Sequence, residues 1–199
     1  MLLSLAIVAA AYLMGSVSFA VVASKLFRLP DPHTYGSGNP GATNVLRTGN
    51  KAAAGLTLLG DGAKGWLAVF LAQRAAASFD VASWTVAATA FAVFVGHLYP
   101  VYHRFRGGKG VATGAGIVLA LNWPLWLVLA LVWLVIAYGF RISSLAALIA
   151  TALMPIGMFY LFGNSPIAWA MTAMGMMLFW RHRANIRQLV TGKERSIGR

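Results

Sequence analysis

The chain has 199 residues, of which 59% are hydrophobic and only 10% are charged, and it contains no cysteine. Soluble domains carry about a quarter charged residues, so this composition indicates an integral membrane protein, and the absence of cysteine excludes disulfides and thiolate metal sites. The net charge of +12 is expected to reflect membrane topology and no nucleic-acid partner, because Lys and Arg collect in the cytoplasmic loops of membrane proteins.

The apolar segments predict an all-α integral membrane protein with a single domain over residues 1–199. Basic or glycine-rich segments separate them, and we find no soluble domain, linker or repeat. In chain order the apolar segments are Leu2–Ser24, Ala52–Ala72, Val81–Val101, Val111–Phe140, Ser143–Phe162 and Ser165–Trp180.

The segment Val111–Phe140 decides how many helices cross the membrane. Its 30 residues exceed one crossing of about 20 residues, and Asn122-Trp123-Pro124 interrupts it. A tight turn at Pro124 would give one short helix (about 111–121) and a transmembrane bundle of seven helices. The short helix would either pack inside the bundle or span a thinned region of the membrane. All but two of the 16 Lys and Arg residues would then lie inside, which favours an outside N-terminus and a cytoplasmic C-terminus.

The segment GSGNPGATNVLR, residues Gly36–Arg47, is the most informative polar part of the chain. It offers backbone N–H groups, side-chain amides and a guanidinium, a combination that suits phosphate. Its glycines permit positive φ and a close approach of the backbone to a ligand. A flexible glycine loop is the alternative interpretation.

The segment GDGAKG, residues Gly60–Gly65, places two ionisable groups inside an apolar helix. Asp61 and Lys64 are three residues apart, so they share a helix face and can neutralise each other. Charged groups in such helices usually face the bundle interior. A structural ion pair and direct ligand contact both remain open.

The segment GHLYPVYHRFRGGKGVAT, Gly96–Thr113, carries Lys109 in a glycine nest with Gly107 and Gly108. It lacks the upstream glycine and the Ser or Thr of a P-loop, which argues against nucleotide binding. A helix is predicted to begin at Val111, where free N–H groups and the helix dipole favour an anion. This loop is therefore a second candidate phosphate site.

Other polar residues of that segment have less specific interpretations. Arg104 and Arg106 are expected to be topology charges. His97 is either a packed, hydrogen-bonded histidine or a catalytic one.

The segment Trp180–Glu194 extends the last apolar helix into a basic tail. His182 and Asn185 are three residues apart and are expected to share one side of a helix. Arg181 and Arg183 are expected to point elsewhere, as lipid-facing side chains whose charges reach the interface.

Together these residues resemble the bacterial membrane family of acyl-phosphate:glycerol-3-phosphate acyltransferases, the PlsY type. The matching segments follow the order of that family's motifs and span essentially the whole chain: GSGNPGATNVLR, GDGAKG, GHLYPVYHRFRGGKGVAT and HRANIRQL. Gln188 departs from the family, since many relatives carry a basic residue there. The resemblance implies a seven-helix bundle in the bacterial cytoplasmic (inner) membrane, with the active site on the cytoplasmic face.

The resemblance also implies the reaction. A fatty acyl group passes from acyl phosphate to the 1-hydroxyl of glycerol 3-phosphate, which gives lysophosphatidic acid and phosphate in the first acylation of phospholipid biosynthesis. Both substrates carry phosphate, so several anion-binding groups must meet at one mouth of the bundle, and the acyl tail needs an apolar groove. We expect a monomer in the lipid bilayer that needs no cofactor.

The matching motifs assign the site residues. Those expected to act in catalysis and to bind glycerol 3-phosphate are Ser37, Arg47, Lys109, His182 and Asn185. Those expected to shape the phosphate pocket are Gly38, Asn39, Gly41, Thr43, Asn44, Gly107 and Gly108. Those expected to support the site are Asp61, Lys64 and His97.

The inventory of bases is small. The four carboxylates are Asp31, Asp61, Asp80 and Glu194, and no His is followed five residues later by Asp. Acyl phosphate is already activated, so positioning and charge stabilisation can supply much of the rate. A substrate phosphate oxygen can accept the hydroxyl proton, with His182 as the protein alternative. Scattered carboxylates do not predict a metal site.

Two other classes remain as alternatives. A transporter of phosphate or an organic phosphate would share the basic pocket, but it is expected to show paired discontinuous helices from repeated halves. A CDP-alcohol phosphotransferase would need more Asp residues near Asp61, and the next acid is Asp80. The acyltransferase interpretation fits the sequence better than either.

The orientation is directly testable. A reporter fused after Arg199 is expected to behave as cytoplasmic, because the basic residues after Trp180 are expected to stay inside. Paired fusions to alkaline phosphatase and to a fluorescent protein measure this. A periplasmic signal would overturn the seven-helix arrangement.

Overall fold

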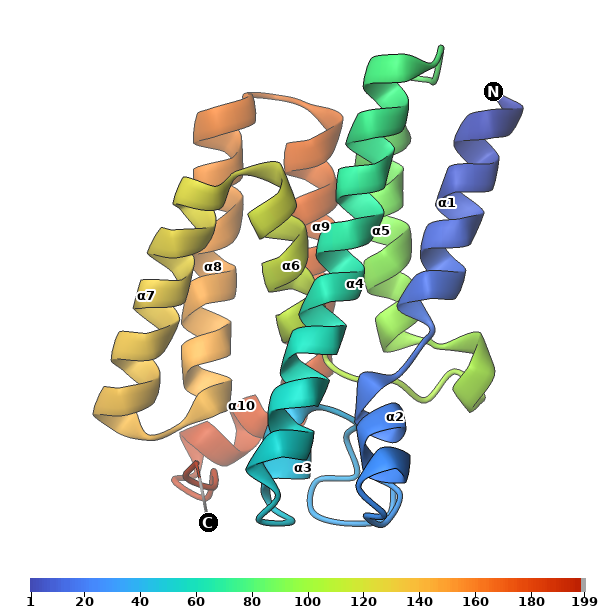
Figure 1. Ribbon diagram of the computed structural model, residues 1–199. Coiled ribbons are helices and arrows are strands. Elements are labelled where there is room, and N and C mark those ends of the chain that lie inside the picture. Colours follow the sequence, from blue (N-terminus) through green and yellow to red (C-terminus); the bar gives the residue numbers. More distant parts are fainter. Residues whose placement is uncertain (198–199) are drawn as a thin grey trace.

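The computed structural model describes residues 1–197, and over these residues it contains helices and no strand (Figure 1). The predicted all-α fold is therefore confirmed. The helices are α1 (Leu2–Gly15), α2 (Phe19–Leu26), α3 (Ala42–Leu46), α4 (Lys51–Ser78), α5 (Thr85–Leu98), the 3₁₀ turn η1 (Val101–His103), α6 (Val111–Leu121), α7 (Trp123–Phe140), α8 (Ser143–Phe162), α9 (Pro166–Arg181) and α10 (Arg183–Val190).

Three segments of this bundle are long and apolar enough to cross a membrane: Thr85–His103, α7 and α8. The pair α1 and α2 would make a fourth, but the two helices are bent by 41°. The count of seven helices and the orientation of the ends stay predictions.

The apolar segment Leu2–Ser24, which the sequence predicts to be one span, is broken in the structure. The chain leaves the helix at Ser16 and restarts at Phe19. The Ser16 hydroxyl donates to the Tyr12 carbonyl at 2.9 Å, and side chains that bond the local backbone in this way compete with regular helix. Apolar composition alone does not reveal such a break.

The predicted interruption of Val111–Phe140 is confirmed, and it centres on Asn122. The Asn122 side chain accepts from the Leu125 N–H at 2.9 Å and caps α7, as Asn does at helix starts. Pro124 lies in the first turn of α7, where its missing N–H is not needed.

The short helix α6 packs inside the bundle, one of its two expected arrangements, and Ile117 and Val118 on it are buried. It lies close against α4 through glycines (Figure 1). A Cβ on Gly116 would collide with the Gly62 carbonyl, and a Cβ on Gly65 with the backbone of α6. Small residues let membrane helices approach closely in this way.

A buried ion pair holds the break between α1 and α2. Lys64 Nζ lies 2.9 Å from Asp61 Oδ1, and both side chains are about 97% buried. Lys64 also donates to the Val17 carbonyl at 2.6 Å, and the Phe19 N–H donates to Asp61 Oδ1 at 3.4 Å. The ion pair is thus one of the two interpretations that the sequence leaves open for Asp61 and Lys64, and it satisfies backbone groups that the break leaves without helical partners.

Removing one charge of this pair is expected to destabilise the protein. Lys64→Met would leave the Asp61 carboxylate and the Val17 carbonyl in the interior without that partner, and such changes cost about 3–5 kcal/mol. The thermal midpoint in detergent should fall well below that of Lys51→Met, which removes an exposed lysine from the same helix. Equal midpoints for the two variants would contradict this account.

Candidate functional site

One cavity brings the predicted segments together at one end of the bundle. Figure 1 shows α3, α10 and the C-terminal segment at that end, beside the lower half of α4. The residues that line the cavity include Ser37, Asn39, Gly41, Thr43, Asn44, Arg47, Asp61, His97, Lys109, Gly110, Ser143, Ser144, His182, Asn185 and Glu194. Most of the residues predicted from the motifs therefore meet in one place.

Four predicted residues lie outside the lining. Gly38 belongs to the first loop, and its N–H donates to the Tyr35 carbonyl at 2.9 Å. Gly107 and Gly108 directly precede Lys109 in the chain, and Lys64 is paired with Asp61. These three residues therefore adjoin residues that line the cavity.

The first loop is held by Asn44, a residue of α3 that is only 2% exposed. Asn44 Oδ1 accepts from the Ser37 N–H at 2.9 Å, and its Nδ2 donates to the carbonyls of Pro32 and Tyr35 at 2.9 and 3.2 Å. Gly36 has φ +60° and faces Asn44 so closely that a Cβ would collide with Oδ1. The Asn44 amide thus shapes the loop that carries Ser37.

The second loop is fixed by hydrogen bonds on both sides of its backbone. The N–H groups of Gly107 and Gly108 donate to the carbonyls of Leu98 and His97 at 3.2 and 3.1 Å. Arg181 donates to the Gly107 carbonyl from Nη2 at 2.6 Å and to the Gly108 carbonyl from Nε at 3.1 Å. The two glycine amides are therefore engaged within the protein in this arrangement.

The prediction that Arg181 faces lipid is wrong. Its guanidinium binds the second loop and lies over the Tyr99 ring, 5.7 Å from the centroid. Arg183, two residues later, is exposed and lies over the Trp180 ring at 4.9 Å. The turn at His182 between α9 and α10 separates the directions of the two arginines.

Lys109 begins a chain of hydrogen bonds across the cavity. Lys109 Nζ donates to Asn185 Oδ1 at 2.6 Å, and Asn185 Nδ2 donates to Glu194 Oε1 at 2.6 Å. The Ser144 hydroxyl also donates to Glu194 Oε1, at 2.6 Å. The amide of Asn185 is thereby held with its oxygen toward the lysine.

The pKa of Lys109 lies close to neutral pH. Burial, opposed by Glu194 and reinforced by the positive charges of Arg47 and Arg181, lowers the pKa of Lys109 to about 8. A bound anion favours the protonated form. Lys109 is therefore a cation that an anionic ligand stabilises.

His182 is neutral under the same conditions. Burial, followed by the charge of Lys109, lowers the pKa of His182 to about 4. His182 Nδ1 lies 2.9 Å from the Leu178 carbonyl, which only accepts, so we assign the proton to Nδ1 and a free lone pair to Nε2. The imidazole can accept a hydrogen bond in the cavity.

His97 borders the cavity from α5. Its Nδ1 lies 3.6 Å from Asp61 Oδ1, and its side chain is 7% exposed. Its ring lies so close to Gly108 that a Cβ there would collide with Nε2. This packed position is one of the two interpretations of His97 that the sequence leaves open.

Several residues that line the cavity were not predicted from the sequence. Ser143 and Ser144 begin α8, and Thr43 lies 3.3 Å from Ser143 between their hydroxyl oxygens. The Trp133 indole N–H is buried without a hydrogen-bond partner among the described residues. Of these residues, only Glu194 could have been recognised from the sequence, because it is the single acidic residue in the basic tail.

Within residues 1–197, no group of three or more His, Asp or Glu side chains is arranged to hold a metal ion.

Comparison with known sequences decides the family. The sequence model of the family described as glycerol-3-phosphate acyltransferase matches residues 5–192. The chain belongs to this family. The glycerol-3-phosphate acyltransferase of Ralstonia nicotianae is 60% identical over 189 residues, which are 95% of this chain and 91% of the relative. That of Burkholderia vietnamiensis is 58% identical over 190 residues, 94% of this chain and 88% of the relative.

Solved structures agree with the family assignment. The chain is similar to two crystal structures of PlsY (YgiH), described as an integral membrane glycerol 3-phosphate acyltransferase. The glycerol 3-phosphate form has a TM-score of 0.90 at 38% identity, over 98% of this chain and 96% of that one. The lysophosphatidic acid form has a TM-score of 0.88 at 37% identity, over 98% and 95%. The resemblance seen in the motifs is confirmed, and the transporter and phosphotransferase alternatives are set aside.

The charge of Lys109 predicts how anion binding by this acyltransferase depends on pH. Sulfate keeps its charge across the range, so its stabilisation of the protein should weaken as pH rises through about 8, where Lys109 loses its proton. Thermal midpoints with sulfate and with chloride at equal ionic strength measure this.

Lys109→Arg is the control for the sulfate experiment, because arginine stays protonated. Its stabilisation by sulfate should persist at higher pH. The same pH dependence in both proteins would contradict the assignment.

Proposed function

We propose that this protein transfers a fatty acyl group from acyl phosphate to the 1-hydroxyl of glycerol 3-phosphate. The products are lysophosphatidic acid and inorganic phosphate, in the first acylation step of phospholipid biosynthesis. Family membership supports the acylation of glycerol 3-phosphate, as do the similar PlsY forms described with glycerol 3-phosphate and with lysophosphatidic acid. The observation that carries the proposal is the convergence of Arg47, Lys109, His182 and Asn185 on one cavity.

The phosphate of glycerol 3-phosphate is held by two cations from different loops. Arg47 offers a planar fork that can bind two phosphate oxygens, and Lys109 offers a point charge. Ser37 and Asn185 add hydrogen-bonding groups at the same cavity. Asn39 and Gly41 of the first loop, with Thr43 and Asn44 of α3, line the same cavity around the anion.

The reaction needs little help from a base. The 1-hydroxyl oxygen attacks the acyl carbonyl carbon, the bond from that carbon to the phosphate oxygen breaks, and its electron pair leaves with phosphate. The hydroxyl proton passes to a phosphate oxygen of a substrate. His182, with its pKa near 4, holds a proton weakly at neutral pH, so its role is to orient the hydroxyl through Nε2.

The acyl tail lies along the apolar side of the cavity. Leu58 of α4, Trp133 of α7 and Ala147 of α8 contribute to that wall. Leu58 is 53% exposed on the bundle surface, which suits a tail that extends between helices toward lipid.

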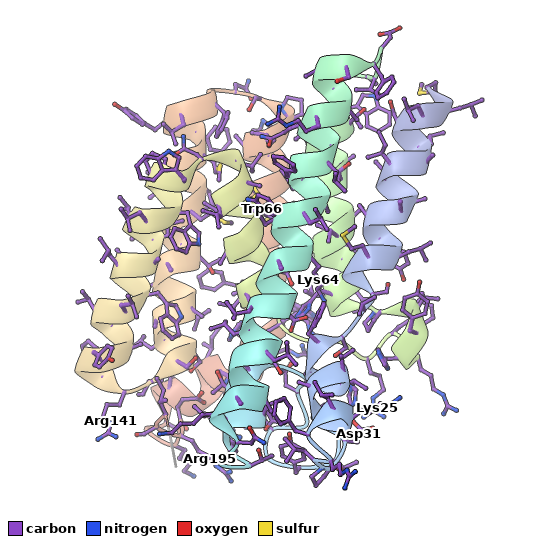
Figure 2. All side chains as sticks on the ribbon, viewed as in Figure 1. Lys25, Asp31, Lys64, Trp66, Arg141 and Arg195 are labelled. Carbon is purple, nitrogen blue, oxygen red and sulfur yellow. The ribbon has the colours of Figure 1, made fainter. Side chains whose placement is uncertain are left out.

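The site faces the cytoplasm of a bacterial cell, and the enzyme is a monomer in the inner membrane with seven helices. Figure 2 shows Lys25, Arg141 and Arg195 at the end of the bundle where the cavity lies. Clustering of basic residues at one end supports a cytoplasmic orientation for it. The N-terminus, at the opposite end in Figure 1, is then outside.

The proposal predicts which basic residues matter. Lys109→Ala and Arg47→Ala should each lower kcat/KM for glycerol 3-phosphate by roughly 10²-fold or more, because each removes a charge-assisted hydrogen bond and the positioning that it provides. Arg104→Ala, an exposed arginine near Lys109 in sequence, should have little effect. Kinetics of the purified, equally stable variants in lipid or detergent measure this.

Comparable losses for Arg104→Ala and Lys109→Ala would contradict the proposed pocket. They would mean that the overall positive charge of this face matters, and that specific contacts to phosphate do not.

A further inference from the structure

The proposed chemistry leaves Arg181 without a role, although its guanidinium binds the second loop. It is the last residue of α9 and immediately precedes His182. Its Nη2 and Nε donate to two consecutive carbonyls, of Gly107 and Gly108, at 2.6 and 3.1 Å. Lys109 follows these two glycines directly, so the Arg181 guanidinium binds the backbone segment that leads to the lysine.

The remaining polar groups of the two glycines are also fixed. Their N–H groups donate to the last carbonyls of α5, those of Leu98 and His97. Both glycines are buried, and a Cβ on either would collide with neighbouring atoms. Four hydrogen bonds therefore set the path of this backbone, and Arg181 supplies two of them.

Arg181 is itself held in place. Its guanidinium lies 5.7 Å from the centroid of the Tyr99 ring, a distance at which the cation and the ring attract. The Tyr99 carbonyl accepts from the Tyr12 hydroxyl at 2.9 Å, which ties this residue to α1. The end of α9 is thus joined to the end of α5 across the back of the cavity.

We propose that Arg181 is a positioning residue for the acyl transfer. Its fork fixes the Gly107–Gly108 backbone and so places the Lys109 ammonium relative to His182 and Asn185. The inference rests on the proposed function of the cavity, and it assigns Arg181 no contact with substrate. Lysine cannot replace it, because an ammonium is a point charge and does not span two carbonyls in fixed geometry.

The competing explanation is that Arg181 contributes only positive charge. Arg181→Lys separates the two, because it keeps the charge and removes the fork. It should lower kcat/KM for glycerol 3-phosphate by about tenfold or more, since small displacements of a positioning group carry large rate effects. Wild-type kinetics in Arg181→Lys would overturn the proposal.

Arg183→Lys is the matched control. It makes the same chemical change two residues away, at an exposed arginine that contacts Trp180. Its kcat/KM should stay within about twofold of wild type, as for most surface changes. Equal losses in both variants would also overturn the proposal.

A double-mutant cycle tests whether Arg181 acts through Lys109. In protein that already carries Lys109→Ala, the further change Arg181→Lys should have little effect on kcat/KM, because the group that it positions is gone. Fully additive losses would mean that Arg181 acts by another route, and would contradict the inference.

Chemical rescue distinguishes loss of the guanidinium from loss of folding. Methylguanidinium should restore activity to Arg181→Ala, whereas methylammonium should not, because only the planar fork can bridge both carbonyls. Rescue by both cations, or by neither, counts against the proposal. A wild-type enzyme that does not acylate glycerol 3-phosphate would instead refute the proposed function, so the two failures are distinguishable.

Discussion

The buried pair of Asp61 and Lys64 is the interaction on which the rest of the structure depends. Charges inside an apolar bundle are costly unless each finds a partner, and here each partner has a structural task. Lys64 satisfies the Val17 carbonyl and Asp61 the Phe19 N–H, at the break between α1 and α2. The chain turns at this break into α2 and the first loop, so the ion pair connects α4 to the segment that leads to the cavity.

The two loops proposed to bind phosphate are shaped by side chains that bind their backbone. Both ends of the Asn44 amide bond the backbone of the first loop, and the Arg181 guanidinium bonds that of the second. Glycine is needed at Gly36 because the Asn44 side chain lies where a Cβ would be, and at Gly108 because the His97 ring does. The Lys109 ammonium, which donates to Asn185 Oδ1, is in this way held at the cavity without substrate, as the proposed catalysis by positioning requires.

Much of this architecture could be predicted from the sequence, because its causes are local. The Asn122 break follows from capping and proline, and the Asp61–Lys64 pair follows from helical spacing. The features that were missed depend on partners far along the chain. The apolar residues around Val17 give no sign of Lys64, 47 positions away, and the direction of Arg181 depends on a turn between α9 and α10 that composition does not reveal.

The central claim is that two phosphate-bearing substrates react in one cavity. The most direct test is release of inorganic phosphate from acyl phosphate by the purified protein, with and without glycerol 3-phosphate. The account predicts that release depends on glycerol 3-phosphate and equals the lysophosphatidic acid formed. Release at the same rate without glycerol 3-phosphate, or lysophosphatidic acid formed from a different acyl donor with no use of acyl phosphate, would contradict it.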